Sequence, residues 1–197
     1  MHLFIELLTL LFFLATVAHA VWLRGKSGAG LFGALLFLGF VRENFVILRE
    51  VLYGFAPLTL MLGKAPVIAS IIWGYSIYLA VIWAEAMTNE SLEDRRPSGR
   101  FLTLAALFMI ALACFYEPFL KLIDMARWQS GTRVTLDVPW ITLIGYPSLT
   151  VLFLLLWCQV MRRPAGIART VLLLAGLTVI ALLHVIGLQG LKDLLRW

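Results

Sequence analysis

Apolar residues run along this chain in long continuous blocks that short polar stretches separate. Each block is about 20 residues long, which is the length that an α-helix needs to cross the hydrocarbon core of a bilayer. Strands of a membrane barrel would alternate apolar and polar positions over about ten residues, and these Leu-rich blocks do not alternate. The pattern predicts an all-α, polytopic integral membrane helix bundle, a single transmembrane domain over residues 1–197. The predicted spans are Leu3–Leu23, Leu31–Tyr53, Pro66–Met87, Phe101–Leu122, Trp140–Met161 and Ala168–Leu188.

Composition agrees with a multi-pass membrane protein. Hydrophobic residues make up 62% of the chain and charged residues 14%, with a mean hydropathy of +0.95. A soluble domain is about 45–50% apolar, so one core could not bury this excess. The net charge of +5 fits basic residues kept beside anionic membrane lipid on the cytoplasmic side. Without a basic run or a recognition module, no nucleic acid partner is predicted.

The connections between the spans differ in character. Residues 54–65 are moderately apolar and are interrupted by Pro57 and Gly63, which predicts an interfacial or re-entrant segment. Residues 89–100 form the most polar stretch and are predicted to be a solvated loop. Residues 124–138 form the other long connection, and no internal repeat or second domain is recognised. The first block resembles a signal peptide at Ala18-His19-Ala20, but Glu6 and the lack of preceding basic residues favour a retained helix.

Basic residues are divided almost evenly between the two sets of loops. They cluster in the short first and fifth loops, which carry no acidic residue. Because cytoplasmic loops are enriched in Lys and Arg, this clustering predicts that both termini lie outside.

The second predicted span contains ionisable residues, among them Arg42 and Glu43 near its middle, and Arg49 and Glu50 at its end. A charge at the centre of a membrane helix costs about 2.5–3.5 kcal/mol on insertion scales, so such residues usually face a bundle interior or a cavity. Two interpretations remain open. These residues form ion pairs that help the helix to pack, or Glu43 lines a functional cavity.

The end of the fourth predicted span contains the local pattern that most strongly suggests a functional site. Glu117, Lys121 and Asp124 share one helical stripe, and the first two have the spacing of a favourable ion pair. Pro118 is expected to bend or restart the helix and to free a backbone carbonyl, as often happens beside a membrane site. A plain interfacial helix end is the alternative.

No metal site or cofactor is predicted. The histidines are too far apart for a ligand set, and Cys114 and Cys158 lie inside apolar blocks without metal-type spacing. The segment Gly28–Gly33 matches the G-x-G-x-x-G pattern, but it follows a membrane span instead of a strand, so the match is attributed to chance.

Two stretches together resemble a known family. The first contains Gly39-Phe40-Val41-Arg42-Glu43, Tyr53-Gly54-Phe55, Leu62-Gly63, Pro66 and Trp73. The second contains Glu117-Pro118, Arg127-Trp128, Gly131, Val138-Pro139 and Gly145-Tyr146. In this order they resemble the carotenoid-biosynthesis membrane proteins of the bisanhydrobacterioruberin hydratase type. The chain has Glu117-Pro118 where that pattern has Asp-Pro, and Tyr146 where it has Trp.

The resemblance implies a cofactor-free enzyme in a bacterial or archaeal cytoplasmic membrane that adds water to a terminal C=C bond of an acyclic polyene or another isoprenoid. Such chemistry needs a carboxylic acid kept protonated by apolar surroundings, a group that positions water, and aromatic faces that stabilise a carbocation. On this basis, the expected acid is Glu43 or Glu117, and the expected water-positioning base is Asp124 or Asp137. The expected substrate-binding residues are aromatic: Tyr53, Trp73, Trp128 and Tyr146.

Other functions fit the same sequence. Intramembrane Arg42 and Glu43 could belong to the ion path of a small transporter or channel subunit. The chain could also be a structural partner of other membrane subunits or form a homo-oligomer through small residues such as Gly28–Gly33. A polar cavity open to both sides would favour transport, whereas a dead-end apolar cavity with carboxyl groups would favour the hydratase.

Overall fold

The computed structural model describes residues 2–49, 53–55, 60–93, 96–124, 126–128 and 134–194. Among these residues, six helices are long and apolar enough to cross a membrane, which confirms the predicted all-α membrane bundle. The helices are α1 (His2–Arg24), α2 (Lys26–Arg49), α3 (Val67–Thr88), α4 (Gly99–Leu122), α5 (Trp140–Met161) and α6 (Ile167–Leu194).

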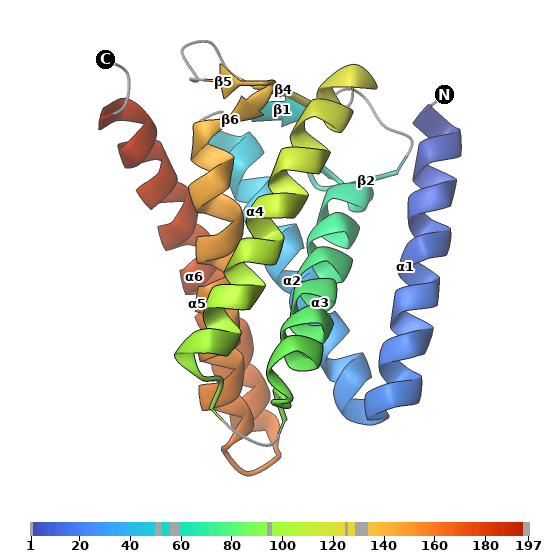
Figure 1. The fold of residues 1–197 in the computed structure, drawn as a ribbon, viewed down its shortest axis with the longest axis vertical. Helices are drawn as coiled ribbons and strands as arrows, with labels where there is room; N and C mark the ends of the chain where they lie inside the picture. Colours follow the sequence, from blue (N-terminus) through green and yellow to red (C-terminus); the bar gives the residue numbers. More distant parts are fainter. Residues whose placement is uncertain are drawn as a thin grey trace.

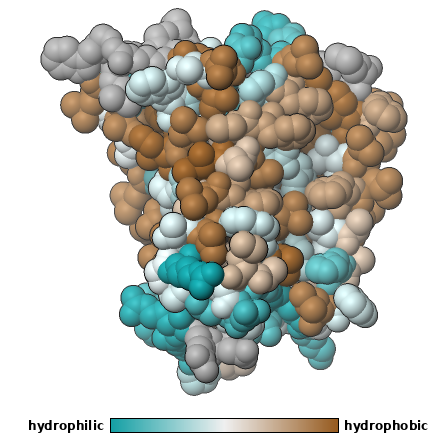
Figure 2. Space-filling model, in the orientation of Figure 1, coloured by the Kyte–Doolittle hydropathy of each residue, from teal (hydrophilic) through white to brown (hydrophobic). Residues whose placement is uncertain are grey.

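Five of the helices form a closed ring, in which α2, α3, α4, α5 and α6 each pack against the next and α6 returns to α2. Helix α1 packs outside this ring against α2 and α3, and it stands at one side of the bundle in Figure 1. Apolar side chains dominate the middle of the face in Figure 2, while hydrophilic residues gather toward its two ends. This distribution is the one expected of a bundle surrounded by lipid.

Short strands lie at the end of the bundle that also holds both termini (Figure 1). Strand β1 (Tyr53–Phe55) pairs antiparallel with β4 (Ala126–Trp128). Strands β2 (Met61–Leu62) and β3 (Ala65–Pro66) form one hairpin, and β5 (Val134–Thr135) and β6 (Val138–Pro139) form another. The described part of the 54–65 segment therefore forms short strands at one end of the bundle, and its interfacial or re-entrant position stays a prediction. Pro57 lies outside the described residues.

The chain contains an internal structural repeat, so the expectation of no repeat was wrong. The order helix, strand, hairpin, helix occurs once as α2–β1–β2–β3–α3 and again as α4–β4–β5–β6–α5. The two halves meet through β1 and β4, whose antiparallel register is centred on Gly54 opposite Arg127. Antiparallel pairing of equivalent strands is the arrangement that a two-fold axis between the halves produces. In each half the second helix follows an equivalent proline, Pro66 or Pro139.

Helix boundaries differ from the prediction where glycine or proline was taken as an interruption. Helix α2 begins at Lys26 instead of Leu31, because the α1–α2 turn needs only Gly25, whose φ of +57° suits glycine. Glu43 therefore lies in the last third of α2 and not near its middle. Helix α4 continues through Pro118 to Leu122 without restarting. Glu50 lies outside the described residues.

Fully buried apolar side chains fill the middle of the bundle. Leu35, Leu38, Tyr78, Met109 and Phe153 have at most 1% of their surface exposed. Close packing here depends on a small residue of α2. A Cβ added to Gly39 would lie 2.9 Å from the Cα of Ser70 in α3, so the helices can approach only because position 39 has no side chain.

Candidate active site

Glu43 is completely buried near the end of α2 and is surrounded by hydrogen-bond donors. Its Oε1 accepts a hydrogen bond from the Trp73 indole at 2.6 Å, and its Oε2 accepts one from the Tyr53 hydroxyl at 2.7 Å. The neighbouring Arg42 forms a close ion pair with Oε1. The Arg42 guanidinium also lies 4.6 Å from the centre of the Trp73 ring, within cation–π range. Glu43 therefore has a cation and two aromatic hydrogen-bond donors beside its carboxyl group.

Glu117 is buried near the end of α4 with only 4% of its surface exposed. The Trp128 indole donates to its Oε2 at 2.8 Å, and the Tyr146 hydroxyl donates to its Oε1 at 2.9 Å. No ion pair among the described residues involves this carboxyl group. Glu117 is therefore a buried acid whose described partners are two uncharged aromatic donors.

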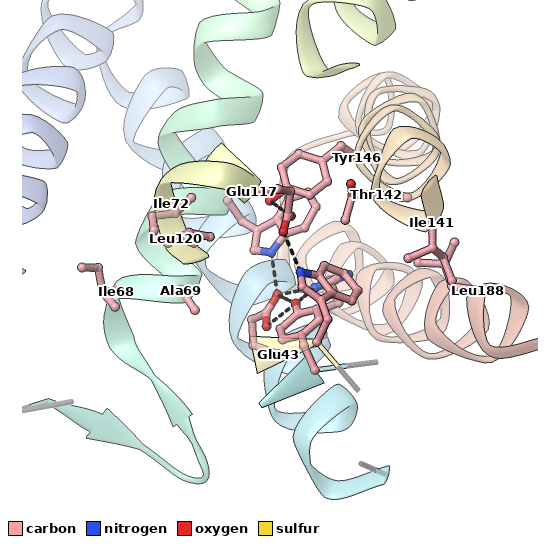
Figure 3. A pocket seen from close by; sticks show the side chains of 15 residues that line it. Glu43, Ile68, Ala69, Ile72, Glu117, Leu120, Ile141, Thr142, Tyr146 and Leu188 are labelled. Carbon is pink, nitrogen blue, oxygen red and sulfur yellow. Dashed lines mark hydrogen bonds and ion pairs between the residues drawn. The ribbon is translucent and has the colours of Figure 1, made fainter. Parts of the chain in front are cut away.

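Both carboxyl groups line one cavity, here called the carboxyl pocket, between helices α2 to α6 and the β1–β4 pair (Figure 3). Its volume is about 40 Å³, which is room for one or a few water molecules or for the tip of an apolar chain. The remaining wall is mostly apolar and includes Ile68, Ile72 and Leu120. The pocket is thus a small, mostly apolar space that both acidic groups line.

The two carboxyl sites are equivalent positions of the repeat. The strand after each acidic helix supplies one aromatic donor, Tyr53 ten residues after Glu43 and Trp128 eleven residues after Glu117. The next helix supplies the other donor, Trp73 or Tyr146, each seven residues after its proline. Tyrosine and tryptophan have simply exchanged places between the halves.

The aromatic donors also contact each other across the repeat. The rings of Tyr53 and Trp128 lie 4.9 Å apart, and so do the rings of Trp73 and Tyr146. Such aromatic pairs stabilise a fold by about 0.5–1.5 kcal/mol in addition to the stabilisation from their buried area. They therefore hold the two carboxyl sites in a fixed relation.

One residue distinguishes the two sites chemically. The residue before Glu43 is Arg42, whereas the residue before Glu117 is Tyr116. The carboxyl group of the first site is consequently paired with a cation, whereas no described residue forms an ion pair with that of the second. Burial raises the pKa of the Tyr53 phenol, which lies outside the spans, well above its usual value, so this group remains a hydrogen-bond donor to Glu43.

The structure brings together six of the eight predicted site residues: Glu43, Tyr53, Trp73, Glu117, Trp128 and Tyr146. The other two, Asp124 and Asp137, do not line the pocket. Both are exposed, with Asp124 bound to Arg127 at 2.7 Å and Asp137 paired with Lys121. The predicted ion pair between Glu117 and Lys121 was wrong, because Lys121 turns outward to the β5–β6 hairpin.

Sequence reasoning undervalued Arg42 and missed the apolar wall from Ile141 and Leu188. The signal that could have revealed the site was the shared order of an acid, an aromatic residue, a proline and a second aromatic residue in both halves, with similar spacing and the same proline-to-aromatic distance of seven residues. Leu188 carries no such signal, since it reaches the pocket only through the packing of α6.

Comparison with protein-family models, with curated proteins and with solved structures gives no match. The resemblance to the carotenoid hydratases therefore stays a prediction from short motifs.

Proposed function

We propose that the carboxyl pocket carries out acid-catalysed hydration of a C=C bond at the end of an acyclic polyene or related isoprenoid. The observation that carries this proposal is the convergence of two buried carboxyl groups on one mostly apolar pocket lined by aromatic rings. Glu43 is paired with Arg42, whereas Glu117 has only neutral donors among the described residues. We infer from this difference that Glu43 is ionised and Glu117 is protonated. Two carboxyl groups held in different protonation states are a recurring basis for paired acid and base roles.

The proposed reaction begins with proton transfer from Glu117 to the terminal carbon–carbon double bond. The π electrons form the new C–H bond and leave a tertiary carbocation, whose charge the Trp128 and Tyr146 rings can stabilise. Glu43 orients a water molecule in the pocket and takes its proton as the water oxygen bonds to the cation. The product is a tertiary alcohol, and one proton passed from Glu43 to Glu117 through pocket water restores the starting state.

The roles of Arg42 and Tyr53 follow from this scheme. Arg42 keeps Glu43 ionised as a base, and Tyr53 fixes the orientation of its carboxylate. A carboxylate that is already held in place needs little reorganisation during the reaction.

The shape of the bundle supports a dead-end site over a transport path. The carboxyl pocket lies at the strand end of the bundle. A buried layer of packed side chains that includes Leu38, Tyr78 and Phe153 fills the bundle between this pocket and the opposite end. A polar path across the membrane would have to pass through this layer. An apolar substrate can instead enter from lipid beside Ile68, Ile72 and Leu120.

Conversion of an acyclic carotenoid such as lycopene by the purified protein in liposomes tests the proposal. Product analysis by chromatography and mass spectrometry is expected to find a hydrated end group with the wild-type chain and with Asp124→Asn. Glu117→Gln is expected to lower the rate at least about 100-fold, in the range of a lost general acid. Full activity of Glu117→Gln would overturn the mechanism.

A further inference from the structure

A second and larger cavity opens at the opposite end of the bundle from the carboxyl pocket. It lies between the N-terminal part of α2, the C-terminal part of α5 and the N-terminal part of α6, and its volume is about 730 Å³. Pockets for small organic ligands typically enclose about 300–1,000 Å³. The proposed hydration does not use this cavity.

The cavity is strongly basic at its mouth. Lys26, Arg162 and Arg169, here called the basic cluster, all line it, and no described acidic residue forms an ion pair with any of them. Glu93 also lines it, but Ser27 and Arg24 already bind this carboxylate. The mouth therefore presents a surplus of positive charge.

Deeper in the cavity the lining becomes apolar. Trp157 and Met161 of α5 and Leu173 of α6 form one wall. Gly30 and Gly33 of α2 form the other, and a Cβ at either glycine would meet no atom within 4 Å. The absence of side chains at these two positions leaves a furrow along α2. The Gly28–Gly33 pattern thus has a structural consequence unrelated to nucleotides.

We infer that this cavity binds an anionic phospholipid, with its phosphate at the basic cluster and part of an acyl chain in the furrow between Gly33 and Leu173. A cationic mouth combined with an apolar furrow matches an amphiphile that carries a negative headgroup. The basic cluster lies at the α1–α2 turn and the α5–α6 connection with their adjoining helix ends, which the clustering of basic residues predicts to be on the cytoplasmic side, where anionic lipid is concentrated.

Lipid binding to the purified, detergent-solubilised chain tests this inference. Native mass spectrometry with added phosphatidylglycerol measures affinity, and phosphatidylcholine and glycerol 3-phosphate serve as comparison ligands. Phosphatidylglycerol is expected to bind the wild-type chain, whereas phosphatidylcholine and glycerol 3-phosphate are not expected to bind it. Replacing all three members of the basic cluster by Gln is expected to weaken phosphatidylglycerol binding by about 100-fold. The matched control K64Q/K121Q/R127Q removes three cations at the other end and is expected to leave binding unchanged.

A second variant keeps the test decisive if the triple replacement does not fold. Gly33→Leu fills the furrow without meeting a neighbour at Cβ and replaces glycine by a better helix former. It is expected to reduce binding at least tenfold, whereas Gly187→Leu, at an equally open position of α6, is expected not to.

Several results would overturn the inference. Equal binding of phosphatidylcholine would mean that charge does not select the ligand, and equal binding of glycerol 3-phosphate would indicate a small-anion site. A Gly33→Leu variant that loses a dimer but retains its lipid would assign the furrow to a second copy of this chain.

Discussion

The same substitution at the two equivalent acids should have unequal effects on stability. In Glu43→Gln the Arg42 guanidinium stays buried, with 4% of its side chain exposed, and loses its counter-charge. In Glu117→Gln a neutral amide replaces an acid that the proposed mechanism takes as neutral, and the amide oxygen can still accept from the Trp128 indole. The chain thus supplies its own matched control.

The expected magnitudes follow from these surroundings. Removing one partner of a buried ion pair costs about 3–5 kcal/mol, because the remaining charge is left without compensation. Replacing one neutral hydrogen-bonding group by another changes stability by about 1 kcal/mol or less. The double variant Arg42→Met with Glu43→Gln should recover most of the loss, since neutral replacement of a whole buried pair is often tolerated.

Unfolding in mixed micelles of dodecyl maltoside and increasing SDS, followed by tryptophan fluorescence, measures these differences. We expect Glu43→Gln to unfold at a clearly lower SDS fraction than both the wild-type chain and Glu117→Gln. Equal destabilisation by the two single variants would refute the assignment of one charged and one uncharged acid. So would a double variant less stable than Glu43→Gln.

Two further predictions concern packing and the excluded aspartates. Gly39→Ala should lower the free energy of unfolding by about 1–3 kcal/mol through overpacking against Ser70, whereas Gly33→Ala should not destabilise the protein. The same SDS titration compares the two variants, and equal stability would contradict the close approach of α2 and α3. Asp124→Asn combined with Asp137→Asn should leave hydration activity unchanged. The change in the free energy of unfolding should be less than about 1 kcal/mol, because both ion pairs are exposed. Loss of turnover would show that these residues take part in the reaction.

Much of the fold could be predicted because lipid imposes a simple rule on sequence. Apolar runs of sufficient length must become helices, and the runs of this chain did so. The helix ends were less predictable. Glycine at Gly28 and Gly30 suggested an interruption, yet both lie inside α2, since in a membrane bundle neighbouring helices and lipid support a glycine-rich helix.

The two acids of the site could be predicted, because burying a charge costs free energy. Glu43 and Glu117 could be found because a carboxyl group inside an apolar run needs partners. Their partners could not be assigned from helical spacing alone. Lys121 has the right spacing for Glu117, but it lies nearer the water and pairs with Asp137 of a hairpin that folds back over the helix end.

The repeat was hidden by small changes at the positions that define it. Tyr53 corresponds to Trp128 and Trp73 to Tyr146, so the aromatic residues are exchanged between the halves. The spacing from the acid to the first aromatic residue also differs by one residue between the halves, as does the spacing from the acid to the proline. Only the shared geometry, with both carboxyl groups facing one pocket, makes the correspondence evident.

The central claim is that Glu117 protonates a carbon–carbon double bond. Turnover of an acyclic carotenoid in D₂O tests it directly, because a proton delivered from an exchangeable carboxyl group becomes deuterium at the carbon beside the new alcohol. The account predicts one deuterium per hydrated end with the wild-type chain and formation of this product at least about 100-fold more slowly with Glu117→Gln. Hydrated product without deuterium at that carbon, or deuterated product from Glu117→Gln at the wild-type rate, would contradict it.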